Sequence, residues 1–201
     1  MIDIGAGPAP YKKIINEAGL IYTSHDFEKY APDSKIPGLQ SSEWPSIGHD
    51  LVCDIKDLPV GKFDLALCTE VLEHVPDPVQ ALYSMRKTLK IGGALLITVP
   101  FASRMHQAPY YFSSGLSNFW FEHHAPLCGF TVNDITIAGD YIDQMIAENQ
   151  LFFGFLRKRR FNLEPYITKT IKRNSGWIRA RLPKDLIQSG GLGVYASLTA
   201  I

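Results

Sequence analysis

The stretch FDLALCTEVLEHVPDP, residues 63–78, begins as a continuous apolar run and then turns polar. Such a run is typical of a strand in a parallel sheet, because helices cover that strand on both faces. Residues 78–89 then repeat apolar side chains at about 3.6 positions, which predicts a helix that ends at Gly92 and Gly93. Residues 94–101, ALLITVPF, predict another strand. This part of the chain therefore predicts a strand–helix–strand unit.

The same alternation extends to both sides of this unit. Further strands are expected at residues 2–4, 20–24, 49–55, 129–139 and 193–201. A helix is expected over residues 11–18, with Gly19 as its C-terminal cap, and a loop rich in Pro and Gly over residues 30–48. Strands that alternate with helices predict an α/β fold, a Rossmann-like doubly wound sheet with helices on both faces.

The length of 201 residues predicts a single domain. Its core is expected at residues 1–138 together with the last strand at 193–201. The intervening residues 141–190 are then an insertion or cap. Within them, the stretch FFGFLRKRRF at 152–161 combines basic and aromatic side chains, which leaves peripheral membrane contact open.

Composition excludes several classes of protein. Lys and Arg together number 20, as do Asp and Glu, and this neutral balance gives no reason to expect a nucleic-acid partner. The three cysteines, Cys53, Cys68 and Cys128, are far apart and form no CxxC pair, which argues against disulfides and a structural zinc site. The sequence shows neither a signal-peptide pattern nor an apolar run long enough for a membrane span. We therefore expect a cytoplasmic protein.

The N-terminal stretch MIDIGAGPAPYKK, residues 1–13, reads as a strand, a glycine turn and a helix. In open α/β sheets, ligands bind beyond the carboxyl ends of the strands, where this turn lies. A dinucleotide fold favours a third glycine at the position of Pro10. Asp26 lies 19 positions after Gly7, a spacing that suits a carboxylate accepting hydrogen bonds from a ribose. Asp54, after the next strand, is a second acid that suits an adenine amino group.

These features together resemble the class I S-adenosylmethionine-dependent methyltransferases of the type-11 group. The matching segments, in the family's order, are DIGAGPAPYKK, SHDFEKY, LVCDIKDLP, FDLALCTEVLEHVPDP, LKIGGALLITVPF and GFTV. The resemblance implies a sheet of about seven strands whose last strand is antiparallel. It also implies S-adenosyl-L-methionine as the cofactor and methyl transfer as the activity.

The resemblance also implies a set of cofactor-binding residues. They are Asp3, Gly5, Ala6, Gly7, Asp26, Phe27, Asp54, Ile55, Cys68, Thr69 and Glu70. The glycines would pass under the methionine part, which Cys68 and Thr69 would line through backbone atoms. Asp26 would hold the ribose, with Glu28 as the alternative. Ala9 replaces a glycine common in the family, which suits alanine if its φ is negative.

Histidines supply the candidates for acid–base chemistry. His106 follows a predicted strand and is the candidate general base for a hydroxyl acceptor. Glu73 and His74 are common in the family and are interpreted as a structural motif at a helix start. Residues 122–124, Glu-His-His, could be taken for a metal cluster. Adjacent residues on a helix face different ways, however, and no third ligand for the two histidines stands at a familiar spacing, so no metal site is expected.

The acceptor is suggested only by resemblance. Residues 100–130 are similar to a stretch in methyltransferases found with polysaccharide and glycosyltransferase genes, which implies O- or N-methylation of a small molecule, a glycan or a sugar nucleotide. One alternative is a non-catalytic binding subunit on a methyltransferase fold. Another is a nicotinamide-dependent reductase, which Pro10 and the absence of a Tyr-x-x-x-Lys pair near a serine disfavour.

Overall fold

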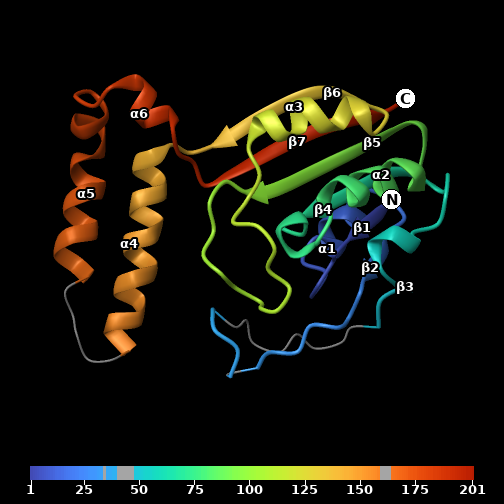
Figure 1. Cartoon of the computed structure of the whole chain (residues 1–201), viewed down its shortest axis with the longest axis horizontal. Coiled ribbons are helices and arrows are strands. Elements are labelled where there is room, and N and C mark those ends of the chain that lie inside the picture. Colours follow the sequence, from blue (N-terminus) through green and yellow to red (C-terminus); the bar gives the residue numbers. More distant parts are fainter. Residues whose placement is uncertain (34, 40–47, 159–163) are drawn as a thin grey trace. The chain divides into compact units, whose positions relative to one another are not determined.

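A computed structural model of the chain describes residues 1–33, 35–39, 48–158 and 164–201. The described residues form two compact units, Met1–Thr136 with Val194–Ile201 and Ile137–Gly193. The first contains the sheet and the second contains three helices (Figure 1). Within the described part of the chain, none of the helices combines the length and the apolar character that crossing a membrane requires.

The seven strands of the sheet follow the order β3-β2-β1-β4-β5-β7-β6. Their bounds are β1 Ile2–Ile4, β2 Thr23–Asp26, β3 Leu51–Val52, β4 Phe63–Thr69, β5 Leu89–Pro100, β6 Phe130–Ala138 and β7 Gly193–Ala200. The first five strands pair in parallel, whereas β7 runs against both of its neighbours (Figure 1). This confirms the predicted doubly wound sheet of seven strands with the last strand antiparallel.

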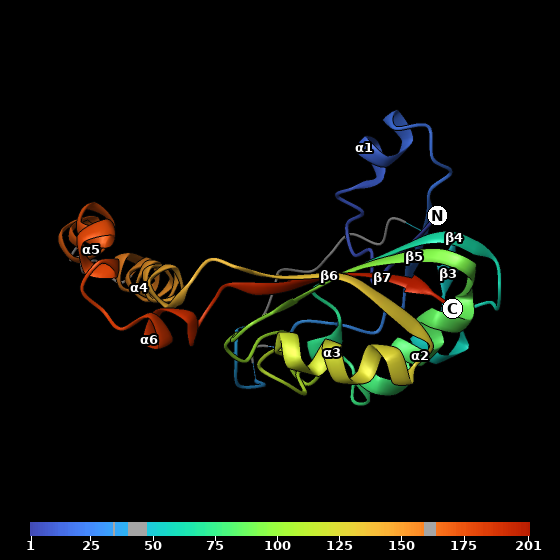
Figure 2. The same cartoon turned by 90° about the horizontal axis from the view of Figure 1, so that it is seen from above.

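Helices cover both faces of this sheet. Figure 2 shows the sheet from its edge, with α1 (Lys12–Glu17) on one face and α2 (Pro78–Thr88) and α3 (Asn118–Leu127) on the other. Helix α2 begins where the sequence suggests, because the Asp77 side chain accepts the Gln80 N–H and Pro78 occupies the first turn. Its Leu82 and Met85 are fully buried.

The strand register brings the carboxyl ends of three neighbouring strands to one edge. Ile4, the last residue of β1, lies opposite His25 in β2 and opposite Cys68 in β4. The register is specified by burial, since a slip of one residue would move every buried side chain to the other face. Ile4 and Cys68 have no exposed surface.

The second strand lies later in the sequence than expected. Residues 20–24 were the predicted strand, but β2 spans Thr23–Asp26, because the three residues of β1 pair with Thr23, Ser24 and His25. Ile21 is largely exposed instead. Asp26 is therefore the last residue of the strand and does not follow it.

The double glycine after α2 does not end that helix, which corrects a second expectation. Helix α2 ends at Thr88 and β5 begins directly at Leu89. The register between β4 and β5 is irregular here, since Phe63 pairs with Leu89 and Leu65 with Ala94. The extra residues of β5 turn at Gly92, whose φ of 78° is one that residues with a Cβ rarely adopt.

The second unit is helical and has an ion-pair cluster at the start of its first helix. Its helices are α4 (Tyr141–Lys158), α5 (Glu164–Arg179) and α6 (Lys184–Gln188). The Arg179 guanidinium donates to both carboxylate oxygens of Asp140, with Nε 2.5 Å from Oδ2, and to Asp143 Oδ1 at 2.6 Å. The end of α5 is thereby tied to the start of α4. Residues 159–161 of the basic–aromatic stretch lie outside the described residues.

This ion-pair cluster predicts a pH-dependent stability of the second unit. Hydrogen bonding from Arg179 holds the pKa of Asp140 below its ordinary value of 3.8. The stabilisation is therefore complete above that value and is lost as the pH falls through the lower folded pKa. Arg179→Gln should cost about 1 kcal/mol at neutral pH, since the side chains are partly exposed, and less at about pH 3.

The measurement is hydrogen exchange resolved to peptides from α4 and α5, comparing variant with wild type at each pH so that the intrinsic exchange rate cancels. Arg181→Gln is the matched control, because Arg181 lies over the Trp177 ring and not against these carboxylates. An Arg179→Gln effect of equal size at both pH values would contradict this account.

Candidate functional site

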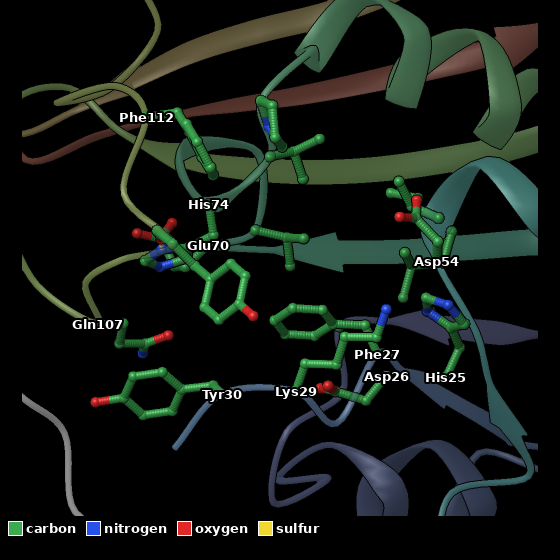
Figure 3. A pocket seen from close by; sticks show the side chains of 17 residues that line it. His25, Asp26, Phe27, Lys29, Tyr30, Asp54, Glu70, His74, Gln107 and Phe112 are labelled. Carbon is green, nitrogen blue, oxygen red and sulfur yellow. Dashed lines mark hydrogen bonds between the residues drawn. The ribbon is translucent and has the colours of Figure 1, made fainter. Parts of the chain in front are cut away.

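The carboxyl ends of β1, β2 and β4 border a cavity of about 290 Å³ (Figure 3). Six of the predicted cofactor-binding residues line it: Gly5, Asp26, Phe27, Asp54, Ile55 and Glu70. These residues come from four separate segments. The fold brings them together beyond the carboxyl ends of the strands, where ligands bind in open α/β sheets.

The other predicted residues are not among those that line the cavity. They are Asp3, Ala6, Gly7, Cys68, Thr69 and His106. The Asp3 carboxylate is buried and accepts a hydrogen bond from the Tyr22 hydroxyl at 2.5 Å, and its pKa is raised mainly by burial. Cys68 is buried within β4, and burial raises the pKa of its thiol.

The glycine turn is anchored on β2 by its backbone. The Ala6 N–H donates to the His25 carbonyl at 2.8 Å, and the Gly7 N–H donates to Asp26 Oδ2 at 3.1 Å. Gly5 has a φ of 69°, and a Cβ built there would lie 2.4 Å from Cγ2 of Val71. A glycine is therefore required at this position for two reasons, its conformation and the close approach of the loop after β4.

Of the two candidate carboxylates for the ribose, Asp26 and Glu28, the structure brings Asp26 to the cavity. Besides the Gly7 N–H, it accepts the Glu28 N–H at 2.9 Å, and its residue is only 7% exposed. A carboxylate offers about four acceptor positions, so further hydrogen bonds from a ligand remain available. Glu28, the alternative, does not line the cavity and has its carboxylate 3.7 Å from the His49 imidazole.

Asp54 and Ile55 present a second polar pair to the cavity. Asp54 caps a short 3₁₀ helix, η1 (Ile55–Asp57), by accepting the Lys56 N–H at 3.2 Å. The first N–H groups of a helix have no partner within it. A carboxylate beside such an N–H matches the amino donor and ring-nitrogen acceptor of an adenine.

Aromatic side chains line the other part of the cavity, and three of them, Tyr30, Tyr110 and Phe112, were not assigned to the site from the sequence. Figure 3 shows Phe27 near the middle, with His25 and Asp54 to one side of it and Tyr30 and Gln107 to the other. Tyr110 meets the Phe27 ring edge-on at 5.0 Å between centroids, and Phe112 also lines the cavity. The aromatic-rich composition of residues 101–129 is a signal for such a wall, but composition does not show which rings face the cavity.

A group of two imidazoles and one carboxyl lies at this aromatic end. Glu73 and His74 belong to a second 3₁₀ helix, η2 (Leu72–His74), and His106 follows β5. Potential ligand atoms of these three side chains all lie within 4.8 Å of one another. His74 lines the cavity and packs against His106 with ring centroids 4.7 Å apart. The structure therefore brings together three possible metal ligands that the sequence did not predict as a group.

Burial is the main cause of the pKa shifts of Glu73 and His74. Glu73 is 1% exposed, and burial, with a smaller contribution from the charge of Glu70, raises its pKa to about 8. Its Oε1 lies 3.7 Å from His74 Nε2, and its Oε2 has no hydrogen-bond partner among the described residues. Burial, and to a lesser degree His106, lowers the pKa of His74. The Glu73 carbonyl also accepts the Phe112 N–H at 2.8 Å, so this residue has a structural role as well.

Both imidazoles have one nitrogen fixed by a backbone carbonyl. His74 Nδ1 lies 2.5 Å from the Tyr110 oxygen, and His106 Nδ1 lies 2.8 Å from the Arg104 oxygen. A carbonyl only accepts, so each Nδ1 must carry the proton and each Nε2 of the neutral ring keeps its lone pair. His123 and His124, by contrast, meet edge-on on α3, with ring centroids 4.8 Å apart.

Two family models, both described as a methyltransferase domain, match residues 2–97 and 51–150. Together they span residues 2–150, including every segment that borders the cavity. With the sheet topology, these matches show that the chain belongs to the class I S-adenosylmethionine-dependent methyltransferases. The predicted family is thereby confirmed, and S-adenosylmethionine is its cofactor.

Individual relatives agree with this membership. A ubiquinone biosynthesis O-methyltransferase of Xanthomonas oryzae is 30% identical over 117 residues, covering 56% of this chain and 46% of that protein. The chain thus spans about half the length of the curated relatives it matches.

Solved structures show the same fold at low identity. A SAM-dependent methyltransferase from Archaeoglobus fulgidus aligns with a TM-score of 0.57 and 14% identity, covering 98% of this chain and 84% of that one. Haemonchus contortus phosphoethanolamine N-methyltransferase 2, in complex with S-adenosyl-L-methionine, aligns with a TM-score of 0.54 and 16% identity, covering all of this chain and 48% of that one.

Ala9, where the family often has glycine, predicts a stabilising substitution. Its φ is 50° and not negative, the left-handed region in which a Cβ costs about 1–2 kcal/mol. Ala9→Gly removes this strain but adds freedom to the unfolded chain, so the free energy of unfolding should rise by about 0.5–1 kcal/mol.

Urea denaturation measures this change. Ala6→Gly is the matched control, since Ala6 is buried in the same turn and does not have a positive φ. That control should lower the stability. If both substitutions were destabilising, the strain assigned to Ala9 would be incorrect.

Proposed function

We propose that this chain transfers a methyl group from S-adenosylmethionine to a hydroxyl oxygen of a small molecule. One observation carries the proposal: a single cavity has Asp26 and Asp54 at one part of its wall and His74, Gln107 and aromatic rings at another. The first part suits a nucleoside and the second suits an acceptor.

The cofactor-binding roles follow the chemistry of the donors and acceptors. Asp26 would accept from the ribose hydroxyls, and Asp54 with the Ile55 N–H would meet the adenine. The turn of Gly5, Ala6 and Gly7 would border the methionine part, opposite the end of β4. The remaining assigned residues are Asp3, which would help to order the turn, and Phe27, Cys68, Thr69 and Glu70. When bound, S-adenosylmethionine supplies a methyl group activated on a sulfonium sulfur.

The acceptor end favours a flat molecule with a hydroxyl group. Tyr30, Tyr110 and Phe112 provide aromatic walls, and Gln107 provides an amide. Aromatic rings stack on one another with a useful gain in energy, and the matched relatives are named O-methyltransferases of ubiquinone biosynthesis. A phenolic ring therefore fits best. A glycan or sugar-nucleotide acceptor stays a prediction from the sequence.

The reaction at a hydroxyl requires the loss of one proton. The acceptor oxygen forms a bond to the methyl carbon, the carbon–sulfur bond breaks, and its electron pair stays on sulfur. The released proton must go to a base or to water. His106, the predicted base, does not line the cavity, but it contacts His74, which does. Of the two imidazoles, His74 is therefore nearer to a bound acceptor.

The rest of the chain fits a single methyltransferase domain with an insertion. We assign the core to residues 1–138 and 193–201, and the helices within residues 141–190 to the insertion or cap. The three cysteines are free thiols, which favours the expected reducing, cytoplasmic location.

Replacement of one carboxylate tests the cofactor site. Asp26→Asn keeps the shape of the side chain but removes the charge, so the Kd for S-adenosylhomocysteine should rise about 10- to 100-fold. Isothermal titration calorimetry measures this, with circular dichroism to show that the variant is folded.

Glu28→Gln is the matched control and should change the Kd less than about twofold, because Glu28 points to His49. Equal weakening by both substitutions, or by neither, would overturn the assignment of the ribose to Asp26.

A further inference from the structure

We infer that Glu73, His74 and His106 form a binding site for a divalent transition-metal ion such as Zn²⁺ or Co²⁺ at the acceptor end of the cavity. The metal site depends on these three side chains and not on the reaction that the chain catalyses. Only the role of the ion in the reaction rests on the proposed function.

The spacing of the three groups suits one ion. Potential ligand atoms lie within 4.8 Å of one another, and an ion with bonds of about 2.0–2.2 Å holds its ligands roughly 3–3.6 Å apart. His106 is only half-buried and lies in the loop after β5. Its side chain can therefore move closer to Glu73 and His74 to reach the shorter spacing that an ion requires. Glu73 and His74 are adjacent on η2 and already have Oε1 and Nε2 at 3.7 Å.

The hydrogen bonds of both imidazoles are those of metal ligands. A metal-bound histidine usually donates its other ring N–H to a carbonyl or carboxylate, which fixes the ring and the tautomer. His74 does so to the Tyr110 carbonyl and His106 to the Arg104 carbonyl. Each ring therefore keeps the Nε2 lone pair for a ligand.

Glu73 gives an independent reason to place a cation here. Within the part of the chain that the structure describes, its Oε2 is buried without a hydrogen-bond partner, and the residue is 1% exposed. A buried carboxyl group without a partner is costly, and native proteins rarely leave one so. A cation bound to the two imidazoles would provide the missing partner.

The ligand set determines which ions fit and what they would do. Two imidazoles and one carboxylate favour Zn²⁺, Co²⁺ or Fe²⁺ over Mg²⁺ or Ca²⁺. Three protein ligands leave a position open for an outside oxygen, and His74 places that position at the cavity. A hydroxyl bound there would lose its proton to solvent more readily, since a cation stabilises the oxyanion. His106 would then act as a ligand and not as a free base.

Cobalt titration tests the site directly. The full chain, freed of metal with a chelator, is titrated with CoCl₂ and followed by calorimetry and by the visible absorption of the ion. We expect one equivalent to bind, and His106→Ala to weaken binding at least tenfold. Glu73→Gln should do the same, with circular dichroism to show that this buried variant is folded. If Glu73→Gln does not fold, the loss of cobalt binding in His106→Ala tests the site by itself.

His123→Ala is the matched control, because this exposed histidine on α3 lies next to another histidine but outside the group. It should leave cobalt binding unchanged. Failure of the wild type to bind one equivalent, or equal weakening by His123→Ala, would overturn the metal site.

Binding of S-adenosylhomocysteine to the same metal-free samples separates the two proposals. If S-adenosylhomocysteine binds and cobalt does not, the metal site is wrong and the cofactor site stands. If cobalt binds and S-adenosylhomocysteine does not, the metal site stands and the proposed function is wrong.

Discussion

The carboxylate of Asp26 holds together the two loops on which one wall of the cavity depends. It accepts the Gly7 N–H from the turn after β1 and the Glu28 N–H from the segment after β2. The parallel register makes this possible, since it brings the ends of both strands to the same edge. Because the carboxylate is fixed by two backbone donors, its remaining acceptor positions are preorganised before any ligand arrives.

Tyr110 connects this wall to the aromatic part of the cavity. Its ring meets Phe27 edge-on, and its carbonyl fixes the His74 imidazole. Nearby, Glu70 and Gln107 both line the cavity and have φ angles of 55° and 51°, which non-glycine residues seldom adopt. Strain of this kind persists only where the surrounding structure enforces it, and it gathers at functional sites. The backbone strain and the ring contacts thus point to the same cavity.

Local patterns were sufficient to predict the fold, whereas the site was predicted only where it follows strand ends. The place of Asp26 and Asp54 at the cavity could be predicted, because acids at the carboxyl ends of parallel strands converge at one edge of the sheet. The position of β2 could not, because pairing with β1 decided it. Gly92 marks an irregularity within β5 and not a helix end, which local turn chemistry cannot distinguish. The grouping of Glu73 and His74 with His106 could not be predicted, because His106 is distant in sequence and approaches them only in the folded chain.

The central claim is that one cavity takes a nucleoside at its acidic part and an acceptor at its aromatic part. A crystal structure of the chain with S-adenosylhomocysteine tests this most directly. The account predicts the ribose hydroxyls within hydrogen-bond distance of the Asp26 carboxylate, and the sulfur directed toward the part of the cavity lined by His74. A ligand bound in another place, or in this cavity with its ribose away from Asp26, would contradict the account.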